Sequence, residues 1–204
     1  DSGKELKTIY VSQADPDYYF GVETIKEIFP TAEVVTTPAV LEKINAKLAG
    51  KIAFWGPKMG ANAPRTPVLP KAISGTTLTV DGQTVEIRGT TGPLAHRPYA
   101  WIPSIKAVVG NIGVFGANMH VWTADTQTVA ERSAWVAQLD EMAALQPALV
   151  VPGHMPAGTA LDVSNVTYTK GYLQAFEKNA AATKTSAELI DAMKKAYPAA
   201  PMGL

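Results

Sequence analysis

Residues 11–21 read VSQADPDYYFG, and they decide the fold that we predict for this chain. An apolar, β-branched run at 8–11 leads into them, and apolar residues at helical spacing follow them between Tyr19 and Phe29. The pattern predicts a strand, then a loop with an amide, two carboxylates and a phenol, then a helix. Loops held by a rigid scaffold often carry binding or catalytic side chains.

The same order of elements repeats directly downstream. The sequence predicts a strand at 32–36 and a helix at 38–49, and glycines and prolines predict an ordered loop at 52–70. Two alternating runs around Asp81-Gly82 predict a hairpin. Further strands are predicted at 99–102, 107–115 and 148–151. This succession favours a layered α/β domain.

Two capping boxes predict the helices of the second half. Thr128 with Glu131, and Thr185 with Glu188, have the spacing in which a hydroxyl and a carboxylate satisfy free amides at a helix start. At 204 residues and 47% hydrophobic, the chain can bury a full core. We predict one domain over 1–204, with its C-terminal helices at about 165–198.

The composition argues against several classes of function. Eighteen basic residues balance eighteen acidic ones, so no net field attracts nucleic acid or an anionic membrane. No apolar run approaches the roughly 20 residues that cross a bilayer. We expect a soluble protein, and the sequence leaves the periplasm and the cytoplasm open. Because cysteine is absent, a metal would need histidine, carboxylate or amide ligands.

The three histidines follow predicted strands, as the opening loop does. His96, His120 and His154 come after the runs at 85–89, 107–115 and 149–151. Side chains at strand ends can converge at one edge of a sheet. Each residue alone also fits an ordinary loop or capping role, and for His120 we favour a structural role. Their joint placement favours a site.

Four segments in this order resemble the metallo-β-lactamase fold hydrolases. They are VSQADPDYYFG, TTGPLAHRP, AVVGNIGVF and LVVPGH. The family pattern is a strand ending in His-x-His-x-Asp-His, a His after a later hairpin, an Asp after an apolar strand, and a His that often follows Pro-Gly. The resemblance implies the α/β class and an αββα sandwich with mixed sheets.

Seven positions correspond, by this resemblance, to the metal ligands of the family: Gln13, Asp15, Asp17, Tyr18, His96, Asn111 and His154. Only Asp17, His96 and His154 keep the family's residue. Amides and a phenol are weaker zinc ligands than imidazole, and Asn111 lacks the bridging charge that lets two dications approach each other. A dinuclear zinc centre is therefore not expected.

Two main functions stay open. In the first, one zinc, manganese or iron ion lies at the metal positions Gln13, Asp15, Asp17, His96, Asn111 and His154, with Asp17, His154 and one of Asp15 or His96 as a facial set of ligands. This ion supports hydrolysis of an ester, amide or thioester in a small-molecule substrate. Asp17 would orient water, and Tyr18 would donate a hydrogen bond to the developing oxyanion. In the second, the chain binds no metal and acts as a binding or interaction protein.

The resemblance also implies a strand-rich half-sheet before residue 1 that is trimmed from the chain, lost, or supplied by another chain, in which case the longer protein is the functional unit. Without that half-sheet, the fold exposes a sheet edge and apolar helix faces. This exposure favours a homodimer or an exchanged contact.

Overall fold

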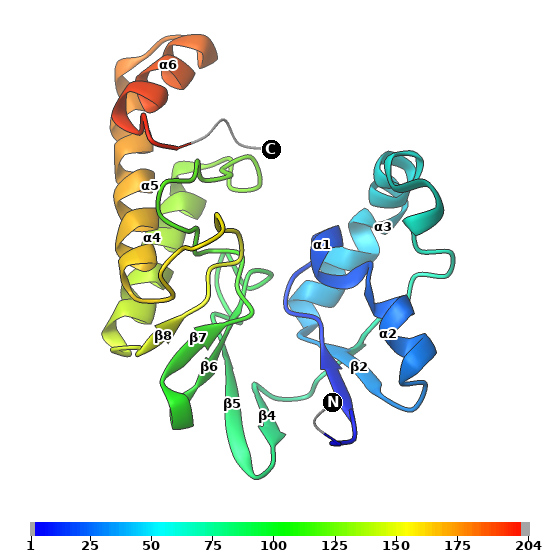
Figure 1. Cartoon of the computed structure of the whole chain (residues 1–204). Helices are drawn as coiled ribbons and strands as arrows, with labels where there is room; N and C mark the ends of the chain where they lie inside the picture. The colour runs from blue at the N-terminus through cyan, green and yellow to red at the C-terminus, as the bar shows by residue number, and fades with distance from the viewer. Residues whose placement is uncertain (1–2, 201–204) are drawn as a thin grey trace.

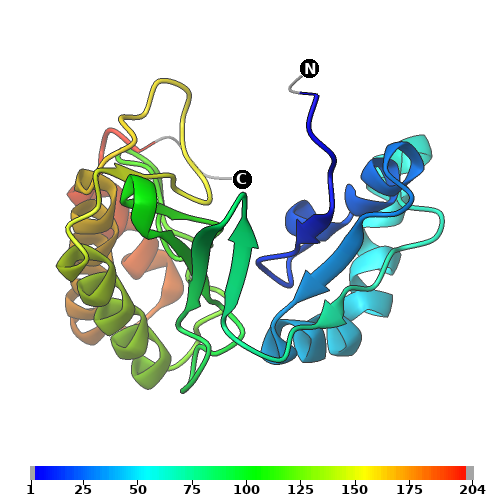
Figure 2. The same ribbon diagram turned by 90° about the horizontal axis from the view of Figure 1, so that it is seen from below.

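The computed structural model describes residues 3–200 as two α/β layers (Figure 1). The first layer contains a parallel sheet in the order β1 (Thr8–Tyr10), β2 (Glu33–Thr36) and β3 (Lys71–Ala72). The second contains a mixed five-stranded sheet in the order β4 to β8. Figure 2 shows the succession helix, sheet, sheet, helix, which confirms the predicted αββα sandwich.

The segment after β1 forms two short helices instead of the single predicted one. α1 (Pro16–Tyr19) begins at the N-cap Asp15, with the fixed φ of Pro16 suited to the first turn. Gly21 separates it from α2 (Val22–Ile28).

The long helix α3 (Pro38–Met59) corrects the sequence prediction. The expected loop at 52–70 was wrong for its first part, because the helix continues through Pro57. Ile52 and Met59 extend the apolar face that packs on the first-layer core. Since Pro57 lies close to the helix end, its missing N–H removes one intrahelical hydrogen bond without stopping the helix early. The 3₁₀ turn η1 (Gly60–Asn62) follows.

The second sheet contains the predicted hairpin. β4 (Thr77–Val80) and β5 (Gln83–Arg88) are antiparallel and joined at Asp81-Gly82, both with positive φ. The other strands are β6 (Tyr99–Ile102), β7 (Ala107–Val109) and β8 (Leu149–Val150), with the 3₁₀ turn η2 (Pro103–Ile105) between β6 and β7.

The strand predicted at 107–115 was too long. β7 ends at Val109 because Gly110 takes a φ of 57° and turns the chain. The backbone returns to the sheet region only at Phe115, which forms an isolated parallel bridge with His154. Asn111 therefore lies in a tight loop and not on a strand.

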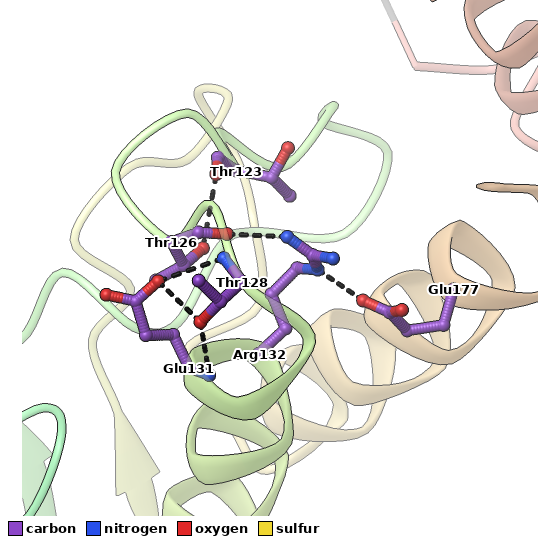
Figure 3. Close-up of polar contacts among 6 residues, drawn as sticks. All are labelled: Thr123, Thr126, Thr128, Glu131, Arg132 and Glu177. Atoms are coloured by element: carbon purple, nitrogen blue, oxygen red, sulfur yellow. Dashed lines mark hydrogen bonds and ion pairs between the residues drawn. The ribbon is translucent and has the colours of Figure 1, made fainter.

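The helices of the second layer are α4 (Val129–Ala144), α5 (Ser164–Ala182) and α6 (Ser186–Ala196). Figure 3 shows the confirmed capping box, in which Thr128 Oγ1 accepts from Glu131 N at 3.1 Å and Thr128 N donates to the Glu131 carboxylate at 3.0 Å. Nearby, Arg132 donates to Thr126 O at 2.7 Å and pairs with Glu177 on α5.

The second capping box is half formed. Thr185 Oγ1 accepts from Glu188 N at 3.2 Å, whereas the Glu188 carboxylate accepts from Lys184 N at 2.8 Å. The start of α6 is therefore capped as predicted, with a different amide on the carboxylate.

Each layer has its own hydrophobic cluster. The first is built around Val11, Val40 and Ile44, and the second around Trp135 and Leu139. No helix within residues 3–200 has the length and apolar character needed to cross a bilayer. The two clusters leave the space between the layers to polar side chains from the loops.

Candidate functional site

Gln13 joins the two layers. Its side chain is 1% exposed, and Nε2 donates to Pro98 O at 2.6 Å and to Gly110 O at 3.3 Å. Pro98 precedes β6 and Gly110 follows β7, so one amide from the loop after β1 closes on two strand ends of the other sheet. Both hydrogens of this amide nitrogen are used by the protein itself.

Asn111 and Tyr18 form a second connection. Asn111 Nδ2 donates to Val151 O at 2.9 Å, and its Oδ1 accepts from Val114 N at 2.8 Å. Tyr18 Oη donates to Asn111 O at 2.9 Å. Burial, with Asp17 and Asp15 nearby, raises the pKa of Tyr18, so the phenol is a neutral donor.

Gly153 packs against this connection. A Cβ atom at Gly153 would lie 2.4 Å from Asn111 O and 2.5 Å from Tyr18 Oη. Only a residue without a side chain allows this close approach. The glycine of the Pro-Gly-His segment therefore has a packing reason in this chain.

Asp17 and His154 form a third connection. His154 Nε2 lies 3.0 Å from Asp17 Oδ2, and the His154 ring stacks on Phe115 with centroids 5.5 Å apart. Among residues 3–200, the buried Nδ1 of His154 has no hydrogen-bond partner. The Asp17 side chain is about half exposed.

His96 lies at a separate cavity of about 70 Å³ between the layers. The residues lining this interlayer cavity are Gln13, Ala14, Asp15, Lys43, Lys47, His96, Arg97, Asp125 and Glu131. Burial, followed by the charges of Lys43, Arg97 and Lys47, lowers the pKa of His96. The imidazole is therefore neutral at neutral pH.

The carboxylates of the interlayer cavity are bound by protein groups. Asp15 pairs with Lys51 at 3.1 Å. Asp125 pairs with Lys47 at 3.5 Å and accepts from Trp122 Nε1 at 2.9 Å. Glu131 belongs to the capping box of α4 (Figure 3).

Two cations of the cavity are not neutralised in this way. Arg97 is 7% exposed and makes no ion pair with residues 3–200. Its guanidinium carbon lies 4.3 Å from the Trp135 ring centroid, and its Nη2 donates to Ile112 O at 3.4 Å. Lys43, half buried on α3, has neither a hydrogen bond nor an ion pair within the described chain.

Sequence reasoning missed the charged part of this cavity. Lys43, Lys47 and Lys51 recur every fourth residue, which places them on one helix face once the segment is known to be helical. Arg97 directly follows His96. These two signals were present, but neither reveals which cations lack a partner.

The predicted site residues are brought together as two groups. Asp17 meets His154, while Gln13 and Asp15 share the interlayer cavity with His96. No three histidine or acidic side chains in residues 3–200 are grouped so that they could hold a metal ion. Asn111 has both ends of its amide bonded to backbone, and the cations around His96 oppose a dication. As arranged, these residues do not fit a metal ion, and the ligand assignment stays a prediction.

The third histidine lies away from both groups. His120 Nδ1 is 2.9 Å from Tyr172 Oη, and the two rings meet edge to face. Tyr172 is a buried residue of α5. This contact agrees with the structural role favoured for His120.

Solved structures share this fold at low sequence identity. A metallo-β-lactamase from Pontibacter korlensis aligns with a TM-score of 0.57 and 22% identity, over 82% of this chain and 69% of that one. A metallo-β-lactamase family protein from Thermus thermophilus aligns with a TM-score of 0.61 and 16% identity, over 95% and 71%. No protein-family model and no curated protein matches the sequence. The chain therefore has the metallo-β-lactamase fold.

One further structural neighbour with this fold is named as a different kind of enzyme, a sulfatase. A double mutant of the sec-alkyl sulfatase PisA1 aligns with a TM-score of 0.58 and 14% identity, over 97% of this chain and 42% of that one. At this identity the likeness concerns the fold, and fold does not fix function.

Proposed function

We propose that this chain is a metal-independent binding protein built on the metallo-β-lactamase fold, with the interlayer cavity as its small-molecule site. One observation carries the proposal: side chains at the metal-ligand positions bond across the two layers. Gln13, Asp17 and Tyr18 reach Pro98, His154 and Asn111, respectively. Direct hydrogen bonds thus occupy positions where the fold's metal enzymes carry ligands.

The chemistry of these side chains supports the proposal. The buried Nε2 of Gln13 donates to two carbonyl oxygens, so the protein itself holds this amide in place, and rotating it away would leave both carbonyls unsatisfied. The same holds for Asn111, whose amide closes its own loop. Metal binding by Asn111 would have to break its hydrogen bonds, and a metal ion at the interlayer cavity would also be repelled by the nearby lysines and arginine.

The second candidate is a hydrolase with a single zinc, manganese or iron ion. It is favoured by the adjacency of Asp17 and His154, two retained ligand positions, and by Nδ1 of His154, which has no hydrogen-bond partner in the described part of the chain. Asp17, Tyr18 and this ion would then belong to an active site for an ester, amide or thioester.

Metal analysis separates the two candidates. We would purify the protein without chelators, load separate samples with zinc, manganese and iron, dialyse them, and measure metal per chain together with the unfolding temperature before and after EDTA. We expect substoichiometric metal and an unchanged unfolding temperature. Asp17→Asn and His154→Gln serve as controls for non-specific binding. One metal per chain that both variants lose would overturn the proposal in favour of the hydrolase.

A further inference from the structure

We propose that the interlayer cavity binds an oxyanion group, a carboxylate, phosphate or sulfate, through Arg97 and Lys43. This inference rests on the proposed function and names the chemical class of its ligand. It starts from two cations of the cavity that form no ion pair within residues 3–200.

The buried guanidinium of Arg97 is the stronger evidence for an oxyanion ligand. A buried guanidinium normally has a carboxylate partner, because an unpaired buried charge costs several kcal/mol. Arg97 instead stacks on Trp135 and has a single long hydrogen bond, to Ile112 O, and its buried Nη1 has no partner among the described residues. The guanidinium fork is the donor that best matches carboxylate and phosphate oxygens.

Lys43 provides a second charge from the opposite layer. It lies on α3 with its side chain half buried at the cavity, whereas Lys47 and Lys51, further along the helix, pair with Asp125 and Asp15. A ligand oxyanion between Lys43 and Arg97 would thus be held by both layers.

The acidic residues of the cavity, three of which act on Arg97, offset these charges only in part. Asp15 and Asp125 each have a lysine partner. Burial opposes ionisation of Asp125, but the hydrogen bond from Trp122 and the charges of Lys47, Lys51 and Arg97 together lower the pKa of this carboxyl. Glu131, in the capping box, is the remaining negative charge. Counting Lys51, four cations meet three carboxylates, so the cavity carries a surplus positive charge.

The size of the cavity also fits. A volume of about 70 Å³ exceeds the roughly 10–15 Å³ that a single water needs, so several waters or one oxyanion group can occupy it. His96 lines the same space and makes no hydrogen bond with residues 3–200, so the single N–H of its neutral ring remains available to a ligand oxygen.

Anion titration tests the inference. Sodium phosphate and sodium acetate would be titrated into the intact protein at constant ionic strength set with sodium chloride, and binding followed by amide chemical shifts and calorimetry. We expect saturable binding that changes the amide chemical shifts of Arg97 and of the loop after β1. Lys43→Gln and Arg97→Lys should each weaken it by about tenfold, the size of one charge-assisted hydrogen bond.

Lys58→Gln is the matched control, because it makes the same change on the same helix at a lysine that lies over the Phe54 ring. This variant should bind like the unmodified protein. Equal binding in all four proteins, or shifts that chloride reproduces, would overturn the inference while leaving metal independence intact. Stoichiometric metal would instead overturn the proposed function, whatever the anion titration gives.

Discussion

Gln13 shows how one residue changes the role of a site. Its neighbours in the chain match the family's strand-end loop, yet its amide nitrogen is fully used by Pro98 O and Gly110 O. At this position a donor is required, because both partners are carbonyl oxygens. The Gln13 side chain therefore links the two layers by hydrogen bonds.

Gln13→Glu should destabilise the protein by about 1–3 kcal/mol near neutral pH, because it replaces the donor by a charged acceptor of the same shape and leaves two carbonyls unsatisfied. Urea denaturation measures the loss. Gln174→Glu, the same change at an exposed position of α5, is the control and should stay near the unmodified stability. Equal stability of the two variants would contradict a stabilising role for the interlayer hydrogen bonds of Gln13.

His96 predicts a pH dependence at the residue scale. Burial and then Lys43, Arg97 and Lys47 lower its pKa in the folded state, whereas the unfolded chain keeps the ordinary value of about 6.5. As pH falls through that range, the unfolded state binds more protons than the folded state. The free energy of unfolding should therefore decrease as the pH is lowered from about 7 to about 5.

Denaturation of the unmodified protein and of His96→Gln at several pH values checks this expectation. The variant should lack the part of the decrease that is due to His96. At about pH 8, where His96 is neutral in both the folded and the unfolded state, the variant reports the pH-independent effect of the substitution on stability. The same slope in both proteins would rule out His96 as the source.

At the scale of elements, the loop after β8 is shaped by close packing. Gly153 N donates to Val114 O at 2.9 Å, and no side chain fits between this residue, Asn111 and Tyr18. The loop that brings His154 to Asp17 is therefore packed against both the Asn111 carbonyl and the Tyr18 hydroxyl.

Gly153→Ala should lower the free energy of unfolding by about 1–3 kcal/mol, the usual cost of an overpacked site. Thermal or urea denaturation measures it. Gly171→Ala on α5 is the control, since a Cβ there meets nothing within 4 Å and alanine favours the helix by roughly 0.5–1 kcal/mol. A Gly153→Ala protein as stable as this control would show that the loop can shift freely.

At the scale of the whole molecule, two hydrophobic clusters are joined by polar contacts. The described buried cluster of the first layer is the smaller one. Because the connections through Gln13, Asp17 and Tyr18 are hydrogen bonds and not a shared apolar core, the layers can open separately.

Native-state hydrogen exchange at rising urea concentrations should therefore show β2 opening at a lower free energy than β6 and β7. Gln13→Glu should lower the opening free energy of the first layer further. Merging of all amides into one common opening at low urea would contradict two separately opening layers.

The homodimer, the lack of a nucleic-acid partner, the compartment and the single-domain assignment stay predictions.

The sequence by itself determined most of the order of elements, but not β3 or the division between α1 and α2. It also determined the hairpin at Asp81-Gly82, the caps at Thr128 and Thr185 and, through the family resemblance, the αββα class. These depend on spacing and turn chemistry within a few residues, and on motif order along the chain. It failed at α3, where apolar packing outweighed Gly56 and Pro57, and at β7, where Gly110 ends the strand.

Only the tertiary structure decided what the polar residues do. The carbonyl partners of Gln13 lie 85 and 97 positions away, and the partner of Asp17 lies 137 positions away. Likewise, nothing local distinguishes Lys43 and Arg97 from the paired Lys47 and Lys51. Whether a buried side chain is satisfied or left unpartnered depends on which distant groups reach it, and that is set only when the two layers close on each other.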